Sequence, residues 1–423
     1  MRAVIIGNSV AAIAGAEAFR AADDAADLVI ISREPYDAYS RPLITYYLAG
    51  KVDEKKMYYR GRDFYASRRI ETILGRTVTR VRTAGGGLVL DNAEELKYDK
   101  LLIATGGVPF VPKIDNLAGR DYCTFTTWDD AKKVKALIPS VRHAVVLGGG
   151  LIGIKVAEAL NHLHVKTTVV ELADRILSPA LDTRASAMVL SAMENAGIDV
   201  LTQQTVVSVE GNNGKVQKVN LSSGASLACD LLVVAIGVIP NVALAADSGI
   251  ATNRGILVDD HMRTSVDDVY AAGDVAEGVD TLLGSTRVIP IWPSAYHQGY
   301  TAGSNMAGAD AAFPGCFAMN SVEVNGTSVI SVGLSTIEQG DYEILVSAEP
   351  GKNEYRKIVI KDDVIVGAIF VNAIDRAGIV TGLIKDRINV RNFKQALSSN
   401  DFGYISLPRD LRKSRLETLG AKL

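Results

Sequence analysis

The chain has 423 residues, and its 45 lysines and arginines against 48 aspartates and glutamates give a formal net charge of −3. This length is enough for about two to three domains of ordinary size, so it excludes a short binding module or a disordered adaptor. The small charge supplies no broad attraction for nucleic acid or anionic lipid, and we expect no nucleic-acid partner. Thirty-eight glycines and 48% hydrophobic residues favour a compact α/β protein with many tight turns.

The N-terminal segment follows the pattern of a dinucleotide-binding βαβ unit. A β-branched run leads through Gly7 into an alanine-rich helix, and a second strand precedes Glu34. Ser9 and Ala12 stand where the second and third glycines of a GxGxxG motif are usual, so this copy of the motif is degenerate. Glu34 lies roughly 20 residues beyond the turn, which is the spacing of an acid that binds a ribose diol.

A second unit of the same design carries the complete motif. Gly148, Gly150 and Gly153 follow a strand and open a helix, and Glu171 follows the next strand. The glycines permit a tight turn and a close approach of the backbone to a pyrophosphate at the helix N-terminus, while the acid binds the ribose. A carboxylate here favours NADH over NADPH because it repels a 2′-phosphate, although Arg175 lies close by in the sequence.

Each unit continues to an apolar strand that ends in glycine, at residues 101–107 and 231–237. A further strand over residues 268–272 is expected to join the first sheet, which makes the second unit an insertion into the first domain. From about Phe313 the pattern changes to alternating strands, with Asn325-Gly326 as a strong hairpin turn and a further hairpin near residues 362–363. We predict a third, smaller α+β domain there.

Five short motifs, together with this order of elements, resemble the flavoproteins with two dinucleotide-binding domains, the pyridine-nucleotide flavin oxidoreductases. The motifs are Glu34-Pro35, Ser40-Arg41-Pro42-Leu43, Ala104-Thr105-Gly106, Tyr270-Ala271-Ala272-Gly273-Asp274 and Trp292-Pro293-Ser294-Ala295. Within that superfamily they resemble the branch of rubredoxin reductases, ferredoxin reductases and the flavin domain of assimilatory nitrite reductases. The resemblance covers nearly the whole chain and implies FAD and NAD(H) as cofactors.

The predicted fold is therefore α/β, with two Rossmann-like domains of the glutathione-reductase type, the NAD domain inserted in the FAD domain, and a small C-terminal α+β domain. The predicted FAD-binding domain comprises residues 1–111 and 240–312, the NAD-binding domain residues 112–239, and the C-terminal domain residues 313–423.

The resemblance also implies roles for individual residues. Asp274 is expected to accept a hydrogen bond from the FAD ribityl chain, Arg41 and Pro42 to border the flavin and pyrophosphate, and the backbone of Val78 to contact adenine. The complete set of expected cofactor-binding residues is Gly7, Asn8, Ser9, Val10, Ala11, Glu34, Arg41, Pro42, Thr45, Val78, Ala104, Thr105, Gly106, Gly148, Gly150, Leu151, Ile152, Gly153, Glu171, Arg175, Gly237, Gly273, Asp274 and Ala295.

Two residues are predicted to act on electron transfer itself. Trp292 matches a position where ferredoxin reductases carry tryptophan beside the flavin, and we expect it on the electron exit route. Just after it, a helix over residues 293–307 is predicted to turn its N-terminal positive charge toward the flavin. Many relatives pair a lysine and a glutamate near flavin N5, where this chain has Tyr46 and Lys155. We hypothesise that Lys155 supplies a positive charge near the flavin or nicotinamide.

Cysteine and histidine usage narrows the chemistry. Cys123, Cys229 and Cys316 form no CxxC, and none lies where the disulfide-reductase relatives carry redox cysteines, so a flavin-to-disulfide relay is not expected. The five histidines show no ligand spacing, and no metal site is predicted. His297 lies on the predicted flavin-facing helix, where we expect a packed or solvated side chain. The cysteines, and the lack of a signal peptide or a long apolar run, favour a cytoplasmic location.

These observations predict an FAD enzyme that takes hydride from NADH at flavin N5 and passes electrons to an iron-sulfur acceptor. The acceptor is either a free rubredoxin or ferredoxin or the iron-sulfur subunit of a larger complex. A basic C-terminal segment, predicted to be helical, is a candidate to steer an acidic partner, through Arg409, Arg412, Lys413, Arg415 and Lys422. The alternatives are an NADH oxidase that uses O2 and a flavoprotein that senses NADH in a binding or signalling role.

Overall fold

The computed structural model describes residues 1–399 and 401–420, which divide into two compact units. Unit 1 comprises residues 1–112, 123–139 and 236–317, and unit 2 comprises residues 113–122, 140–235 and 318–423. Within the described residues, no helix is long and apolar enough to cross a membrane.

Unit 1 is built on a five-stranded parallel sheet in the order β18-β7-β1-β2-β3. Its strands are β1 (Arg2–Ile6), β2 (Asp27–Ser32), β3 (Ile70–Leu74), β7 (Lys100–Ile103) and β18 (Val269–Ala271). The order reverses at β1, between β2 and β7, which is the place where parallel α/β sheets bind ligands. The pairing of β18 with β7 confirms that the chain returns to the first sheet after the inserted unit.

Alternating side chains of these strands form two hydrophobic cores, because successive residues of a strand point to opposite faces. On one face, Ile5 and Ile30 pack with α1 (Val10–Ala22) and α8 (Trp292–Met306). On the other face, Val4 and Val29 pack with a three-stranded antiparallel sheet of β4 (Val78–Arg82), β5 (Gly87–Leu90) and β6 (Glu95–Lys97). Unit 1 is therefore a three-layer structure.

Shorter elements complete unit 1. They are η1 (Arg41–Leu43), α2 (Ile44–Leu48), η2 (Glu54–Lys56), α3 (Phe64–Ser67), β8 (Gly107–Pro109), α4 (Trp128–Leu137), β16 (Val238–Pro240), α7 (Ala243–Ala246), β17 (Ile256–Leu257), β19 (Ala276–Asp280) and β20 (Ser285–Arg287), with η3 (Ile138–Ser140) at the border with unit 2. Strands β8 and β16 pair with each other as a two-stranded antiparallel ribbon.

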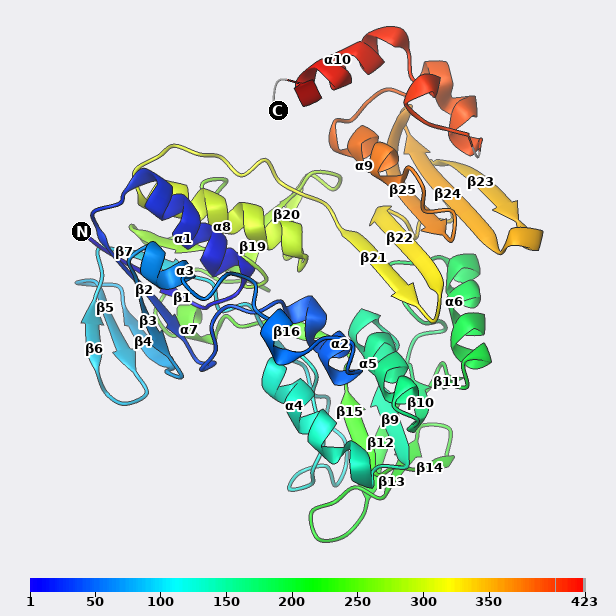
Figure 1. Cartoon of the computed structure of the whole chain (residues 1–423), viewed down its shortest axis with the longest axis horizontal. Helices are drawn as coiled ribbons and strands as arrows, with labels where there is room; N and C mark the ends of the chain where they lie inside the picture. Colours follow the sequence, from blue (N-terminus) through cyan, green and yellow to red (C-terminus); the bar gives the residue numbers. More distant parts are fainter. Residues whose placement is uncertain (400, 421–423) are drawn as a thin grey trace. The chain divides into compact units, whose positions relative to one another are not determined.

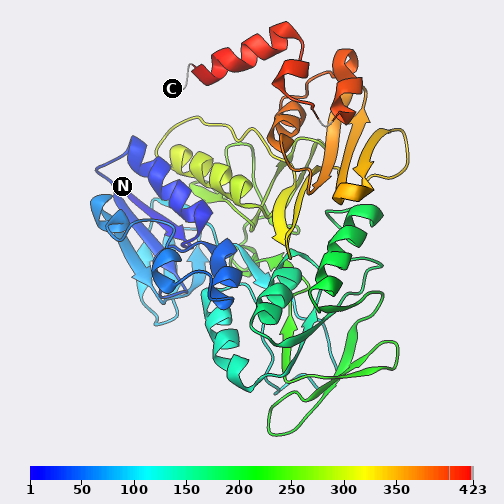
Figure 2. The same cartoon turned by 45° about the vertical axis from the view of Figure 1, so that its right-hand side comes forward.

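Helices α1 and α8 lie side by side, as both views of the chain show (Figure 1 and Figure 2). Glycines make this contact possible. A Cβ atom at Gly299 would overlap the carbonyl oxygen of Ala11, and one at Gly303 would overlap that of Gly15. The two backbones therefore touch directly, with the first turn of α1 against the middle of α8.

Unit 2 begins with a second parallel sheet, in the order β11-β10-β9-β15. It contains β9 (His143–Leu147), β10 (Lys166–Val170), β11 (Asp199–Leu201) and β15 (Leu231–Val234), together with α5 (Leu151–His162), α6 (Thr183–Asn195) and an antiparallel sheet of β12 (Val206–Glu210), β13 (Lys218–Leu221) and β14 (Ser226–Ala228). The two parallel sheets repeat one design, as the sequence pattern predicts.

The C-terminal part of unit 2 is a five-stranded antiparallel sheet in the order β21-β22-β25-β24-β23. Its elements are β21 (Met319–Val324), β22 (Thr327–Gly333), β23 (Glu343–Glu349), η4 (Pro350–Lys352), β24 (Glu354–Lys361), β25 (Val364–Val371), α9 (Ala377–Lys385), η5 (Arg391–Ser398), η6 (Tyr404–Ser406) and α10 (Arg409–Gly420). Both predicted hairpins are confirmed, and the two central residues of each turn, 325–326 and 362–363, have positive φ angles.

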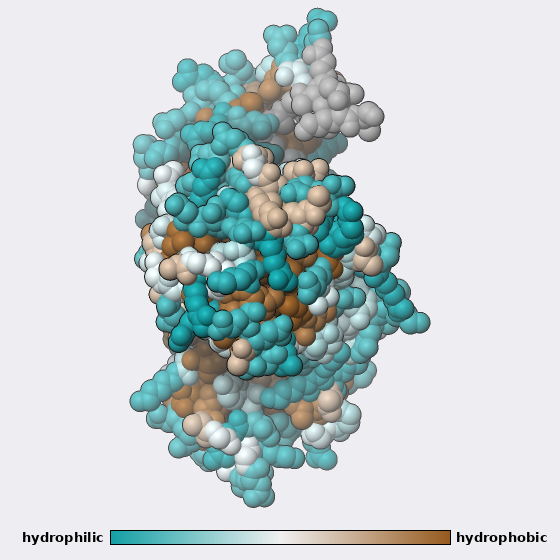
Figure 3. All heavy atoms as spheres, turned by 90° about the vertical axis from the view of Figure 1, so that its left-hand side faces the viewer, coloured by the Kyte–Doolittle hydropathy of each residue, from teal (hydrophilic) through white to brown (hydrophobic). Residues whose placement is uncertain are grey.

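This sheet groups with the second parallel sheet rather than as a separate unit, and residues 123–139 group with unit 1. The predicted domain boundaries themselves stay predictions. On the face shown in Figure 3, hydrophilic side chains cover most of the surface, with a hydrophobic area between them.

Candidate functional site

The first predicted turn lies at the carboxyl end of β1 and packs against the end of β7. Gly7 has a φ of 123°, and a Cβ there would overlap the carbonyl oxygen of Ala104, so only glycine fits. Helix α1 starts three residues later with Ser9 as its N-cap, and the Ser9 side chain makes no capping hydrogen bond. The first amides of α1 are thus left for another acceptor, which is the arrangement that binds phosphate.

Gly273 lies between the first turns of α1 and α8. A Cβ there would lie 3.0 Å from the Cβ of Ala11 and 3.8 Å from that of Ala295. Helix α8 has Pro293 in its first turn, and no side chain caps it. Two helix N-termini and the turn at residues 273–274 therefore meet at one place in unit 1.

Asp274 follows this turn with its carboxylate largely buried. Burial raises the pKa of Asp274, and the positive charge of Arg41 opposes that rise. Within residues 1–399 and 401–420, no donor makes a hydrogen bond to this carboxylate. A buried carboxylate without a donor is costly, so the position fits a ligand that brings a hydroxyl group to it.

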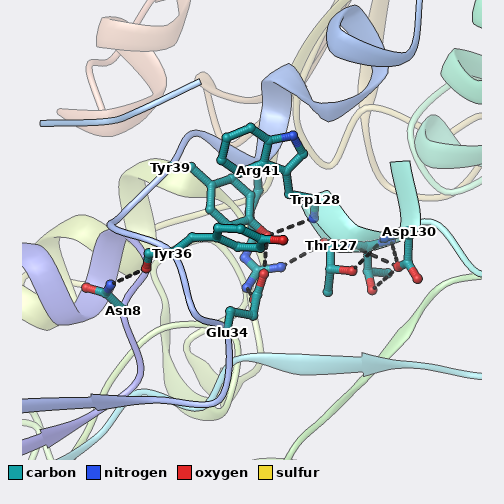
Figure 4. A network of polar contacts seen from close by, with 9 residues as sticks. Asn8, Glu34, Tyr36, Tyr39, Arg41, Thr127, Trp128 and Asp130 are labelled. Atoms are coloured by element: carbon teal, nitrogen blue, oxygen red, sulfur yellow. Dashed lines mark hydrogen bonds and ion pairs between the residues drawn. The ribbon is translucent and has the colours of Figure 1, made fainter. Parts of the chain in front are cut away.

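Glu34 stands at the centre of a polar network (Figure 4). Its Oε2 atom accepts a hydrogen bond of 2.6 Å from Tyr39, and its Oε1 atom pairs with the Arg41 guanidinium. Arg41 also donates to the carbonyl oxygen of Thr126 at 2.7 Å, and the Trp128 amide donates to the Tyr39 hydroxyl at 3.0 Å. The segment with the predicted ribose acid is thus bound to the start of α4.

Helix α4 is capped by side chains at its N-terminus. Thr127 and Asp130 form a reciprocal capping box, in which the Thr127 hydroxyl accepts from the Asp130 amide at 3.1 Å. The Trp128 ring is 1% exposed and contacts the rings of Tyr36, Tyr39, Tyr47 and Tyr58. The side-chain caps of α4 and α6 contrast with the uncapped starts of α1, α5 and α8.

Asn8 joins the first turn to the loop beyond Glu34. Its Nδ2 atom donates to the carbonyl oxygen of Tyr36 at 3.1 Å, and its Oδ1 atom accepts from the Tyr65 hydroxyl at 2.8 Å. The same hydroxyl accepts from the Ala38 amide at 2.9 Å. These contacts hold the degenerate turn in place without the second and third glycines.

Trp292 is the first residue of α8, one position earlier than the predicted start, and it is partly buried. Its ring lies edge-on to that of Tyr59, with 5.0 Å between the ring centroids. Two residues later, the Ser294 hydroxyl accepts a hydrogen bond of 3.0 Å from the Cys316 thiol. Burial raises the pKa of Cys316, which keeps that thiol protonated.

Six other predicted cofactor residues of unit 1 lie on separate elements and loops. Pro42 belongs to η1, Thr45 to α2, and Val78 is the buried first residue of β4. Thr105 donates its hydroxyl to the carbonyl oxygen of Asn241 at 3.0 Å. At the next residue, the carbonyl oxygen of Gly106 accepts from the Asn241 amide at 2.9 Å, so both contacts hold the end of β7 within unit 1. Gly237, at the end of the second glycine-ended strand of the sequence, has a φ of 120° and open space at its Cβ position.

The complete glycine motif lies in unit 2, between β9 and α5. A Cβ at Gly153 would overlap the carbonyl oxygen of Gly148, whereas a Cβ at Gly150 would meet no atom within 4 Å. Gly150 is the N-cap of α5 and has no side chain to cap it, and Leu151 and Ile152 supply the first amides. This is the cradle that a pyrophosphate fills.

Glu171 follows β10 and closes back on the glycine turn. Its carboxylate accepts from the Gly149 amide at 2.5 Å and from the Ala173 amide at 2.7 Å. Arg175 pairs with Asp174 at 2.9 Å and donates from Nε to the carbonyl oxygen of Leu181 at 3.3 Å. The cation nearest to Glu171 in sequence is therefore partly neutralised by its neighbour.

Lys155 lies one turn into α5. Its ammonium pairs with Glu158 and donates to the carbonyl oxygen of Glu323 at 2.9 Å. Glu158 in turn accepts from the Asn325 amide at 3.1 Å. Helix α5 is thus fastened to the β21–β22 turn, and the predicted role of Lys155 beside the nicotinamide stays a prediction.

Three further observations bear on metals, thiols and the basic tail. Ligand atoms of Asp259, Asp260 and His261 lie within 4.8 Å of one another, but both ring nitrogens of His261 already contact carboxylates, of Asp260 at 2.6 Å and of Asp310 at 3.0 Å. The three cysteines form no disulfide. Three of the basic tail residues lie in the described part of α10: Arg409, Arg412 and Lys413. The Arg415 side chain and Lys422 lie outside the described residues.

The comparisons with known proteins agree with this arrangement. The profile of the family "Pyridine nucleotide-disulphide oxidoreductase" matches residues 1–299, and that of "Rubredoxin NAD+ reductase C-terminal domain" matches residues 319–388. The subunit epsilon of NADH-dependent phenylglyoxylate dehydrogenase from Aromatoleum evansii is 30% identical over 400 residues, covering 94% of each chain. The assimilatory nitrate reductase electron transfer subunit of Bacillus subtilis is also 30% identical, over 389 residues, but the chain spans only 49% of that relative.

A solved structure is similar over the same range. The covalent complex of putidaredoxin reductase with putidaredoxin contains a chain that matches with a TM-score of 0.85 and 26% identity, covering 94% of this chain and 95% of that one.

Proposed function

The chain belongs to the pyridine nucleotide-disulphide oxidoreductase family, and from this premise we propose that it is an FAD enzyme that passes electrons between NADH and an iron-sulfur acceptor. The observation that carries the proposal is the meeting of two uncapped helix N-termini with the largely buried carboxylate of Asp274, to which no described residue donates a hydrogen bond. Such a place accepts a ligand that carries both phosphate and hydroxyl groups, as FAD does.

In this proposal, the residues of unit 1 hold FAD. The first amides of α1, at Val10 and Ala11, face the pyrophosphate, and Asp274 accepts from a ribityl hydroxyl. Glu34 retains free lone pairs beyond its bonds to Tyr39 and Arg41, and these accept from the adenosine ribose. When bound, FAD supplies the redox chemistry: it accepts a hydride from NADH and releases the two electrons one at a time.

Unit 2 holds the nicotinamide dinucleotide in the same way. The amides at the start of α5 bind the pyrophosphate, and Glu171 binds the adenosine ribose. NADH is favoured over NADPH because the Glu171 carboxylate repels a 2′-phosphate and Arg175 is already paired with Asp174.

The acceptor is proposed to take electrons directly. Cys123 and Cys229 are buried, and burial raises the pKa of Cys229 to about 12, so that thiol is unreactive. Cys316 is likewise held protonated beside Ser294. No thiolate relay is therefore required, and the absence of a disulfide among the three cysteines of the described residues also supports a reducing, cytoplasmic location.

The relatives narrow the class of acceptor. The matching C-terminal family is named for rubredoxin reductase, the similar solved structure is a complex with putidaredoxin, and one relative is a dehydrogenase subunit. We propose either a small iron-sulfur protein or the iron-sulfur subunit of a larger oxidoreductase, in which this chain is the flavin subunit.

The test is anaerobic stopped-flow absorbance of the holoprotein mixed with NADH or NADPH. We expect NADH to bleach the flavin band rapidly and NADPH to do so much more slowly. A second mixing step adds oxidised rubredoxin, oxidised ferredoxin or O2. Reoxidation that is fastest with an iron-sulfur protein supports the proposal. Fastest reoxidation by O2 favours an NADH oxidase, and a bound flavin that NADH does not reduce contradicts the proposal.

A further inference from the structure

The segment that joins Glu171 to α6 is fastened at both ends. At its first end, Glu171 accepts from the Gly149 amide, and the Leu177 amide donates to the Gly149 carbonyl oxygen at 2.9 Å. Further along, the Ser186 hydroxyl donates to the carbonyl oxygen of Ile176 at 2.8 Å. The segment therefore lies directly on Gly149, the residue between the first two glycines of the GxGxxG motif.

At its second end lies Asp182, whose side chain is 4% exposed. Its Oδ1 atom caps α6 by accepting from the Ala185 amide at 2.9 Å. Its Oδ2 atom accepts from the Tyr355 hydroxyl at 2.6 Å and lies 3.1 Å from the ammonium of Lys357. Tyr355 and Lys357 both belong to β24, which lies between β25 and the edge strand β23 of the C-terminal sheet.

Two further contacts join the same segment to the loop that connects β22 and β23. The Ser335 hydroxyl donates to the carbonyl oxygen of Ala180 at 2.9 Å, and the Thr183 amide donates to the Glu338 carboxylate at 3.2 Å. The segment on either side of Asp182 is thus bound to residues more than 150 positions away in the sequence.

The charge pair between Asp182 and Lys357 is the part of this contact with the largest desolvation cost. The Lys357 side chain is 3% exposed, and its ammonium completes no hydrogen bond with the described residues, so the 3.1 Å charge contact with Asp182 is what compensates it. Each of the two charges is therefore tolerated in the interior only because the other is present. A partner pair of this kind fixes one arrangement of the segment and excludes looser ones.

We propose that the C-terminal sheet positions the nucleotide-binding segment, with Tyr355 and Lys357 acting through Asp182 on the segment that carries Glu171. This inference rests on the proposed function, because it takes Glu171 and the α5 turn as the NADH site. Tyr355, Lys357 and Asp182 are positioning residues. They touch neither the pyrophosphate turn nor Glu171, and they set the place of the ribose-binding carboxylate through residues 172–181.

The test compares Tyr355→Phe with Tyr342→Phe in the FAD-loaded protein. Tyr342 lies next to β23 on the same sheet, with the Lys361 ammonium over its ring, and serves as the matched control. We expect Tyr355→Phe to raise the KM for NADH about five- to tenfold, the size expected for the loss of one ordinary hydrogen bond, with kcat at saturating NADH nearly unchanged. Tyr342→Phe is expected to change neither constant.

Hydrogen exchange gives a second readout that does not depend on activity. Peptides that cover residues 172–182 are expected to exchange faster in Tyr355→Phe than in wild type or Tyr342→Phe. Asp182→Asn keeps an N-cap acceptor for α6 but removes the charge opposite Lys357, so it is expected to show the same two changes more strongly.

The outcomes separate the two proposals. If NADH reduces the wild-type flavin and both Asp182→Asn and Tyr355→Phe keep the wild-type KM, the positioning role is wrong while the proposed function stands. A fall in kcat and FAD content together, without a specific rise in KM, also contradicts it, because that result indicates general destabilisation. A wild-type flavin that NADH does not reduce overturns the proposed function, and the positioning role with it.

Discussion

The side chain of Gln298 holds the turn that leads to Asp274. Its Oε1 atom accepts a hydrogen bond of 2.8 Å from the backbone amide of Gly273, and the residue is 1% exposed. Gln298 belongs to α8, whose first turn meets α1 at the same place. One buried amide group thus connects the helix with the proposed flavin-binding carboxylate.

Gln298→Met is expected to weaken FAD binding. The substitution keeps a side chain of similar length but leaves the Gly273 amide buried without an acceptor, which costs about 1–3 kcal/mol. Fluorescence titration of apoprotein with FAD is expected to show a dissociation constant raised roughly tenfold or more. Gln339→Met, at an exposed position, is the control. Equal FAD affinities for the two variants would contradict the positioning of this turn by Gln298.

Gly299→Ala is expected to destabilise unit 1. The added Cβ would overlap the Ala11 carbonyl oxygen and force α1 and α8 apart, an overpacking that costs about 1–3 kcal/mol. Gly378→Ala is a suitable comparison, because Gly378 lies in α9 with open space at its Cβ and alanine favours helices. Thermal unfolding followed by far-UV circular dichroism is expected to show a lower Tm for the first variant only.

The carboxyl group of Asp274 is expected to make the stability of the apoprotein depend on pH. Burial raises its folded-state pKa above the ordinary 3.8, so the folded state holds a proton that the unfolded state has released. The free energy of unfolding therefore falls as the pH rises from 3.8 through the folded-state pKa. Asp274→Asn is expected to remove this component, and so to stabilise the apoprotein at neutral pH while weakening FAD binding. Urea unfolding at several pH values checks the first effect, and a steeper fall of stability in the variant than in wild type would exclude it.

Trp292→Leu is expected to separate the two halves of the reaction. If Trp292 lies on the exit route, anaerobic reduction of the flavin by NADH keeps its rate, while electron delivery to an iron-sulfur acceptor slows. Double-mixing stopped-flow absorbance measures both rates. Tyr59→Leu removes the ring that packs edge-on against Trp292 and controls for loss of packing. Unchanged delivery in Trp292→Leu would remove this residue from the route.

Lys155→Met tests the charge proposed near the nicotinamide. We expect flavin reduction by NADH to slow at least about tenfold if this cation stabilises the electron-rich flavin. Glu158→Gln removes its ion-pair partner and keeps the positive charge, so reduction is expected to continue in that variant. Normal reduction in both variants, with a lower Tm, would limit Lys155 to fastening α5 to the β21–β22 turn.

Sequence reasoning predicted the features that depend on neighbouring residues. The turns at Gly7 and Gly148 and the hairpin at Asn325-Gly326 follow from local backbone requirements, and all three have the positive φ angles that such turns need. The return of residues 268–272 to the first sheet followed from the repeated order of strands, and the pairing of β18 with β7 confirms it.

The contacts that hold the site were not predicted, because each joins residues far apart in the sequence. Gln298 reaches Gly273, Tyr65 reaches Asn8, and the Trp128 amide reaches the hydroxyl of Tyr39, 89 positions away. The residues next to a buried glutamine or tryptophan in the sequence do not indicate which distant residue it contacts. The two glycines of α8 carried a weak signal, since glycine inside a helix is unfavourable unless another backbone approaches closely.

Strand β18 joins the first sheet from a position late in the sequence, and this sets the order in which parts of the chain can fold during synthesis. Strand β7 can pair with β18 only after residues 269–271 have been synthesised. Helix α1 can pack against α8 only after the chain has reached about residue 300. By that time the ribosome has already released the residues of the inserted sheet, whose contacts are closer together in sequence and close sooner. The FAD site can therefore be completed only late in synthesis, after both β18 and α8 have left the ribosome.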